Sequence, residues 1–213
     1  MQKTITVRGT GHATAKPDSV HILFQLVNRN KQYLRAMNDA SRDLDSLKKS
    51  LQSVGVSPDE LKTINFSVDT DRKYVDGRYI FDCFAVHHKF KIVMDFDRKS
   101  LGRVLSAVTK SCSDPELTVK FTVKDQTAIK DELFATAAAN ARNIAESLCK
   151  GSGATLGALL SINYSWQEVD FYSHTEEAPR CPSGVASGGC APPEINPDDI
   201  EASDSVTFVW ALE

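Results

Sequence analysis

The chain has 213 residues, 41% of them hydrophobic, and carries 28 acidic side chains against 25 lysines and arginines. This size and composition allow a sizeable core, in one large domain or two small ones. The net charge of -3 provides no overall attraction for nucleic acid or an anionic membrane, and no apolar run approaches the roughly 20 residues that span a bilayer.

The N-terminus and the cysteines bear on the cellular compartment. Residues 1–7 enter a strand pattern directly, without the apolar segment of a secretory signal. We therefore expect a cytoplasmic protein, or a periplasmic or exported one if a signal peptide has been removed. The five cysteines are an odd number at irregular spacings, which suits reduced thiols better than a disulfide framework.

The first thirty residues predict two strands that pair with each other. Ile5 and Val7 alternate with polar residues, and residues 20–26 carry apolar side chains at every second position. Gly9 and Gly11 interrupt the first strand. They resemble a dinucleotide-binding fingerprint only superficially, because its third glycine is missing. We interpret them as glycines that let an edge strand bend.

Residues 31–54 predict a helix with one apolar stripe, and residues 61–71 and 79–94 predict a hairpin that turns at Asp76-Gly77. In the second hairpin strand, adjacent His87 and His88 point to opposite faces, so they cannot chelate one metal together. His88 falls on the apolar face, as a core histidine with satisfied hydrogen bonds. That face also carries Phe84, Val86, Phe90, Ile92 and Met94, and the more exposed face carries Phe81, Cys83, Ala85, His87, Lys89 and Lys91.

Two more helices and three strands follow. Asp97 is the predicted N-cap of a helix through Val108, and residues 117–123 alternate as a strand. Asp125 is predicted to cap a long Ala-rich helix that stops at Lys150-Gly151. Strands at residues 154–166 and 206–212 close the chain. The expected buried stripe of the Ala-rich helix is Phe134, Ala137, Ala138, Ala141, Ile144, Ala145 and Leu148.

The segment 167–197 is a long stretch without periodicity, far beyond the usual loop length. Its His174, Cys181 and Cys190 are candidate zinc ligands, although the Cys-x8-Cys spacing matches no common zinc module. A disulfide in an exported protein and an unstructured loop remain as alternatives. If the loop binds a peptide, a small ligand or a metal, the aromatic anchors are predicted to be Trp166, Phe171 and Tyr172.

No nucleophile elbow, P-loop, HExxH or paired-carboxylate signature is present in the sequence. We therefore predict no catalytic residue and no cofactor, and expect a non-enzymatic protein.

Several short motifs, each unspecific by itself because it consists largely of Gly, Ala and Pro punctuation, together resemble the SIMPL-domain family in their order and spacing. This family of bacterial proteins of unknown function includes periplasmic immunogenic and oxidative-stress-linked members. The motifs are residues 5–18, 53–56, 61–68, 139–148, 153–162 and 195–210.

The resemblance implies an α+β fold, in which about three helices pack on an antiparallel or mixed sheet, within a single domain over residues 1–213. It also implies a tendency to form large ring-like or channel-like homo-oligomers, and it implies no catalytic residue. The first hypothesis is therefore a self-assembling, stress-related protein. The second is a binding module that uses the 167–197 loop.

Overall fold

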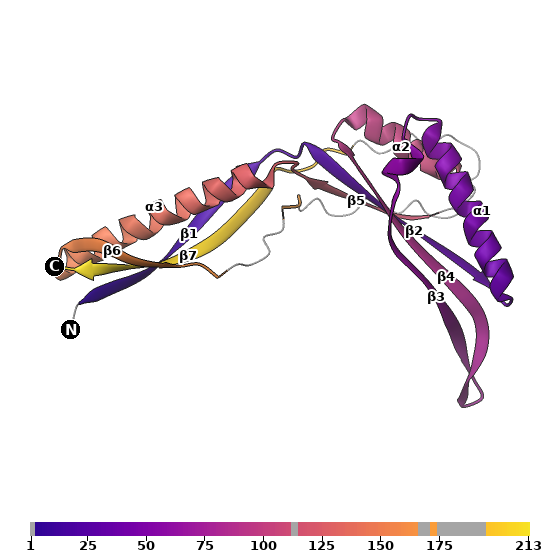
Figure 1. The fold of residues 1–213 in the computed structure, drawn as a ribbon, viewed down its shortest axis with the longest axis horizontal. Coiled ribbons are helices and arrows are strands. Elements are labelled where there is room, and N and C mark those ends of the chain that lie inside the picture. Colours follow the sequence, from indigo (N-terminus) through magenta and orange to yellow (C-terminus); the bar gives the residue numbers. More distant parts are fainter. Residues whose placement is uncertain (1–2, 112–114, 166–170, 174–194) are drawn as a thin grey trace. The chain divides into compact units, whose positions relative to one another are not determined.

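A computed structural model describes residues 3–111, 115–165, 171–173 and 195–213. The described residues group into two compact units. Unit 1 holds residues 3–18, 122–165, 171–173 and 197–213, and unit 2 holds residues 19–111, 115–121 and 195–196. Each unit has its own sheet, and the described residues form three α-helices, which confirms the predicted α+β class (Figure 1). The prediction of one domain over residues 1–213 stays a prediction, since compact units also occur within single domains.

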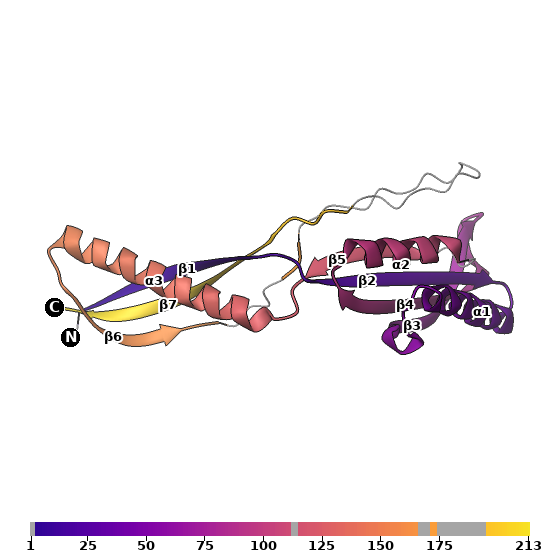
Figure 2. The ribbon, with the colours of Figure 1, turned by 90° about the horizontal axis from the view of Figure 1, so that it is seen from above.

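Unit 1 is a three-stranded sheet with one long helix on one face. The strand order is β1 (Thr4–Ala15), β7 (Ile200–Leu212) and β6 (Leu156–Asn163), with both pairs antiparallel. Helix α3 (Gln126–Ser152) runs along the sheet, as Figure 2 shows. The helix packs mainly on β1 and β7 and makes few contacts with β6. One part of the core between helix and sheet consists of Val7, Ala137, Ala141, Ala145, Val206, Phe208 and Trp210.

The prediction that the first two strands pair with each other is wrong. β1 pairs with β7 in unit 1, whereas β2 (Ser19–Asn30) lies between β4 and β5 in unit 2. None of the connecting residues 16–18 has the positive φ that a two-residue hairpin turn needs. Asp18 instead binds the residues at which the chain re-enters unit 1: its N–H donates to Thr122 O (3.1 Å) and its Oδ1 accepts from Lys124 N (2.8 Å).

Helix α3 begins at the predicted N-cap. The Asp125 carboxylate accepts hydrogen bonds from Thr127 N (2.9 Å) and Ala128 N (3.4 Å). The helix ends at Ser152, because the residue with the left-handed conformation (φ 71°) that closes it is Gly153, two residues beyond the predicted Gly151.

The predicted stripe of α3 is only partly correct. Its buried residues recur at every fourth position and are Ile129, Leu133, Ala137, Ala141, Ala145 and Cys149. Phe134, Ile144 and Leu148 are instead 37%, 37% and 54% exposed. A row of small residues brings the helix axis close to the sheet, which narrows the contact, so side chains on the flanks of the row stay in solvent.

Gly9 and Gly11 serve this close approach and do not interrupt the strand. β1 continues through both residues. A Cβ atom at Gly9 would lie 2.1 Å from Ala137 O, and one at Gly11 would lie 2.0 Å from Leu133 O. The helix backbone therefore rests directly on the strand, and only glycine fits beneath it.

Unit 2 is a four-stranded sheet in the order β3 (Lys62–Val75), β4 (Arg78–Asp95), β2 and β5 (Glu116–Thr122). Helices α1 (Tyr33–Gln52) and α2 (Arg98–Lys110) and a short 3-10 helix, η1 (Pro58–Glu60), complete it. Asp97 caps α2 as predicted, accepting from Ser100 N at 2.8 Å. The hairpin turn is confirmed by positive φ values at Asp76 (50°) and Gly77 (82°). The core between sheet and helices includes Val20, Ile22, Phe24, Leu26, Leu47, Leu51, Phe90, Ile92, Leu101 and Val104.

The prediction of an exposed face on β4 is wrong for Cys83 and Ala85, which are both buried. In the register of the sheet, Ala85 lies opposite Arg29 of β2, and Cys83 lies opposite Asp71 of β3. Arg29 Nε and Asp71 Oδ2 form an ion pair of 3.0 Å. Since the two partners flank β4, this ion pair spans the strand on the face that carries Cys83 and Ala85.

Candidate functional site

The structure describes only part of the predicted binding segment. His174, Cys181, Cys190 and Trp166 lie outside the described residues, as does most of segment 167–197. Phe171 is 3% exposed and belongs to a core cluster of unit 1, and its carbonyl accepts a hydrogen bond from Thr122 Oγ1 (2.7 Å). Tyr172 is half-buried and forms a bridge with Thr122. In this conformation the Phe171 ring packs inside unit 1, and the anchor role of these aromatic residues stays a prediction.

His87 and His88 lie on opposite faces of β4, as predicted. His87 Nε2 is 3.9 Å from Asp69 Oδ2, whereas His88 Nε2 is 3.2 Å from Thr63 Oγ1. The His88 ring packs on Phe66 and Phe90. Burial, and to a smaller extent the charge of Lys48, lowers the pKa of His88. This histidine is therefore a neutral, packed side chain at neutral pH.

Within the described ranges, no group of three or more His, Cys, Asp or Glu side chains is arranged to hold a metal ion. Nor does any helix in those ranges combine the length and hydropathy needed to cross a bilayer. The surfaces that stand out are two apolar ones and one cationic groove.

The first apolar surface follows strand β6, which is an edge of the unit 1 sheet. On this strand Leu159, Leu160 and Ile162 are 48%, 46% and 55% exposed. Leu159 and Ile162 pair with Trp210 and Phe208 of β7, whose side chains face α3. Leu159 and Ile162 therefore lie on the same face of the sheet as the helix, but beyond the region that α3 covers. We call the set Leu159, Leu160, Ile162, Tyr164 and Phe134 the β6 surface.

Phe134 and Tyr164 extend this surface from the strand to the helix. Their rings meet edge to face, with centroids 5.1 Å apart. The Tyr164 hydroxyl donates to Asp204 Oδ2 (2.8 Å), which ties it to strand β7. The β6 surface thus combines an edge strand with a partly exposed aromatic pair held in one orientation.

The opposite edge of the same sheet is partly covered by helix α3. The backbone N–H of Thr10 in β1 donates to Asn140 Oδ1 (3.0 Å), and that of His12 donates to Thr136 Oγ1 (3.2 Å). Polar side chains of α3 thereby satisfy donors of the edge strand β1. No described strand or helix does this for the outer edge of β6.

The second apolar surface is the end of the β3–β4 hairpin. Its exposed residues are Tyr74, Val75, Tyr79, Ile80 and Phe81, which we call the hairpin tip. The Tyr74 and Tyr79 rings pack edge to face, with centroids 5.1 Å apart. Charged groups interrupt this surface, including the ion pair of Lys73 and Asp82 (2.9 Å).

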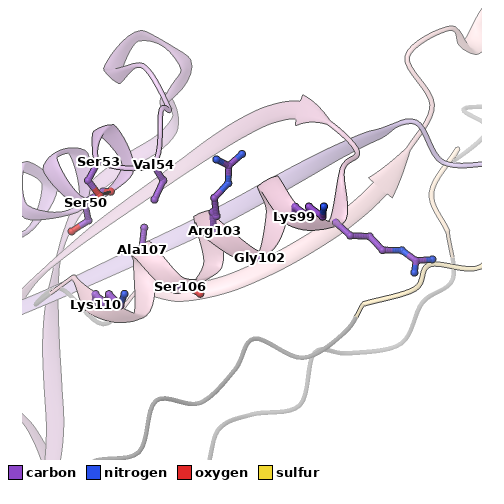
Figure 3. A pocket seen from close by; sticks show the side chains of 10 residues that line it. Ser50, Ser53, Val54, Lys99, Gly102, Arg103, Ser106, Ala107 and Lys110 are labelled. Carbon is purple, nitrogen blue, oxygen red and sulfur yellow. Dashed lines mark hydrogen bonds between the residues drawn. The ribbon is translucent and has the colours of Figure 1, made fainter.

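The third feature is a groove of about 510 Å³ in unit 2, between the C-terminal end of α1 and helix α2 (Figure 3). It is lined by Ser50, Ser53, Val54, Arg98, Lys99, Gly102, Arg103, Ser106, Ala107 and Lys110. The sequence pattern does not reveal this groove, because its walls come from segments about fifty residues apart. The signal that was present is the run of cations in the first turns of residues 98–110.

Comparison with known proteins identifies a family and little else. The model of the SIMPL family, described as "Protein of unknown function (DUF541)", matches residues 5–210, a range that includes parts of both units. None of the curated proteins matches the chain. A solved structure, "De novo designed protein Foldit4", is 15% identical and covers 51% of this chain and 100% of its own, with a TM-score of 0.22. A similarity of that size carries no argument about function.

Proposed function

Since the chain belongs to the SIMPL family, whose function is unknown, we propose a role from its surface, namely that it assembles with copies of itself through the β6 surface. The observation that carries this proposal is an open edge strand with three exposed apolar side chains, Leu159, Leu160 and Ile162. An edge strand presents a row of backbone donors and acceptors that a strand from another chain can pair with.

The composition of β6 supports this choice among the edge strands. Its sequence, Leu-Gly-Ala-Leu-Leu-Ser-Ile-Asn, contains no charge and no proline. The other edges carry charges that oppose pairing, such as Arg8 in β1, Asp71 in β3 and Lys120 in β5. β6 therefore lacks the charges and prolines that keep edge strands from associating, and its irregularities are two shifts of its register with β7, at Leu156/Leu159 and Leu159/Ser161.

The apolar side chains add a driving force. Each of Leu159, Leu160 and Ile162 is about half exposed. Covering the remaining half of such a side chain contributes roughly 1 kcal/mol, and every copy in a contact brings the same set. The partner that we propose for the β6 surface is a second copy of this chain. A stress-related role for the assembly stays a prediction, as does the binding function of the 167–197 loop.

The test is the native mass of the purified chain, measured by light scattering over a wide concentration range. We expect a mass above that of one chain, and a lower mass for Ile162→Lys, which places a charge on the open edge. Tyr79→Lys at the hairpin tip makes the same chemical change at another exposed apolar position and should leave the mass unchanged.

The outcomes separate two parts of the proposal. A wild-type chain that stays monomeric at every concentration would refute self-assembly. A mass that falls for Tyr79→Lys and not for Ile162→Lys would keep self-assembly and refute the β6 contact.

A further inference from the structure

The groove of unit 2 is cationic in a chain whose net charge is negative. Four of the residues that line it are the cations Arg98, Lys99, Arg103 and Lys110, and none of its described lining residues is acidic. Three serines, Ser50, Ser53 and Ser106, line the same space, and the Ser53 hydroxyl donates to Ser50 O (2.7 Å). In Figure 3, Arg103 extends from α2 on the side where α1 ends. Positively charged side chains and neutral serine side chains thus line the same groove.

Two of the four cations, Arg98 and Lys99, stand in the first turn of α2, where helix electrostatics disfavour them, whereas Lys110 lies in the last turn, where a cation is favoured. The N-terminal end of a helix carries a partial positive charge, which favours acidic residues in the first turn and opposes cations there. The first turn of α2 contains Arg98 and Lys99 and no acidic residue. A local arrangement that costs stability in this way is typical of a functional site, where an anionic ligand offsets the repulsion.

The charges of Lys99, Arg103 and Lys110 are also not held in ion pairs with carboxylates of the described residues. Neither Lys99 nor Lys110 forms an ion pair with a carboxylate of the described residues. Arg103 Nη2 donates to the neutral Ser100 Oγ at 3.0 Å. Arg98 donates to the side chain of Asn196, which is neutral as well. Lys99, Arg103 and Lys110 can therefore bind an anion without first breaking an ion pair with a described residue.

The spacing of the cations sets the size of the ligand. Positions 99, 103 and 110 fall within about 40° of one another around a helix, and positions 99 and 110 are separated by about 16 Å along its axis. One phosphate group cannot reach both ends of such a row. Val54 and Ala107 also line the groove and provide apolar contact for a carbon skeleton.

We propose that this groove binds a small organic anion that carries at least two phosphate groups, held by Lys99, Arg103 and Lys110 and by the serine hydroxyls. This inference does not rest on self-assembly, since the groove lies within unit 2 and the β6 surface within unit 1.

The experiment is calorimetric titration of the full chain with inorganic tripolyphosphate and, separately, with orthophosphate. We expect saturable binding of one tripolyphosphate per chain, at least about tenfold tighter than that of orthophosphate. Arg103→Gln and Lys110→Gln should each weaken it by roughly five- to tenfold. Lys62→Gln and Lys89→Gln remove the same charge outside the groove and should change it less than about twofold. Far-UV circular dichroism checks that each variant is folded.

Three results would overturn the proposal. The first is an absence of saturable tripolyphosphate binding to the wild type. The second is equal weakening by the groove variants and the Lys62 and Lys89 controls, which would indicate unspecific charge attraction. The third is binding to phosphatidylglycerol vesicles that depends on Arg103 when tripolyphosphate does not bind, which would assign the groove to a lipid surface.

Discussion

The contact between α3 and β1 predicts that a single methyl group at Gly9 or Gly11 destabilises unit 1. Alanine at these positions would place its Cβ 2.1 Å from Ala137 O and 2.0 Å from Leu133 O, whereas ordinary contacts begin at 3.4 Å. The helix backbone has to move by more than 1 Å to accept it, and this separates the buried row of Ala137, Ala141 and Ala145 from the sheet.

The size of the effect follows from two opposing contributions. Overpacking a well-packed contact costs about 1–3 kcal/mol or more. Replacing glycine by alanine also restricts the unfolded chain, which contributes about 0.4–1 kcal/mol of stability. We expect a net loss of about 2 kcal/mol for Gly9→Ala and for Gly11→Ala.

Urea unfolding, followed by far-UV circular dichroism and tryptophan fluorescence, measures this loss. Trp210 belongs to the same core cluster and reports on the contact. The matched control is Gly151→Ala in α3, where no atom lies within 4 Å of the new Cβ, and it should gain about 0.5–1 kcal/mol. If Gly9→Ala and Gly11→Ala were as stable as Gly151→Ala, the close approach of helix and strand would be refuted.

Three further predictions concern caps and histidines. Asp125→Ala removes the N-cap of α3 and should cost about 1 kcal/mol in urea unfolding, with Asp125→Asn close to wild type. Hydrogen bonds from Ser100, mainly from its side chain and then from its backbone N–H, hold the pKa of Asp97 below its ordinary value. The stability that this cap contributes should therefore be lost as the pH falls through the depressed pKa. Asp97→Asn should remove this pH dependence of the unfolding free energy. The pKa of His88 is lowered by burial, so the folded chain resists its protonation and stability should decline as pH falls below 6.5. An NMR titration in which His88 titrates at or above 6.5 would contradict this, and His88→Gln should flatten the decline.

The short-range features of this protein were predictable because their causes lie within a few residues. The caps at Asp97 and Asp125 and the turn at Asp76-Gly77 are set by side chains that bind the adjacent backbone or by positive φ values. Alternation and helical periodicity identified the strands and helices, and the order of the motifs identified the family.

The tertiary structure alone decided which elements meet. β1 pairs with β7 at the far end of the chain, although the adjacent β2 has the same strand pattern, since backbone hydrogen bonds do not distinguish partners by sequence distance. Ala85 is buried on a face of β4 that the alternation pattern predicts to be exposed, and Phe134 is partly exposed although helical periodicity predicts it to be buried. The groove, too, exists only because α1 ends beside α2. The hydrophobic pattern indicates which side chains favour burial, but the packing of distant segments determines what fraction of each side chain is buried.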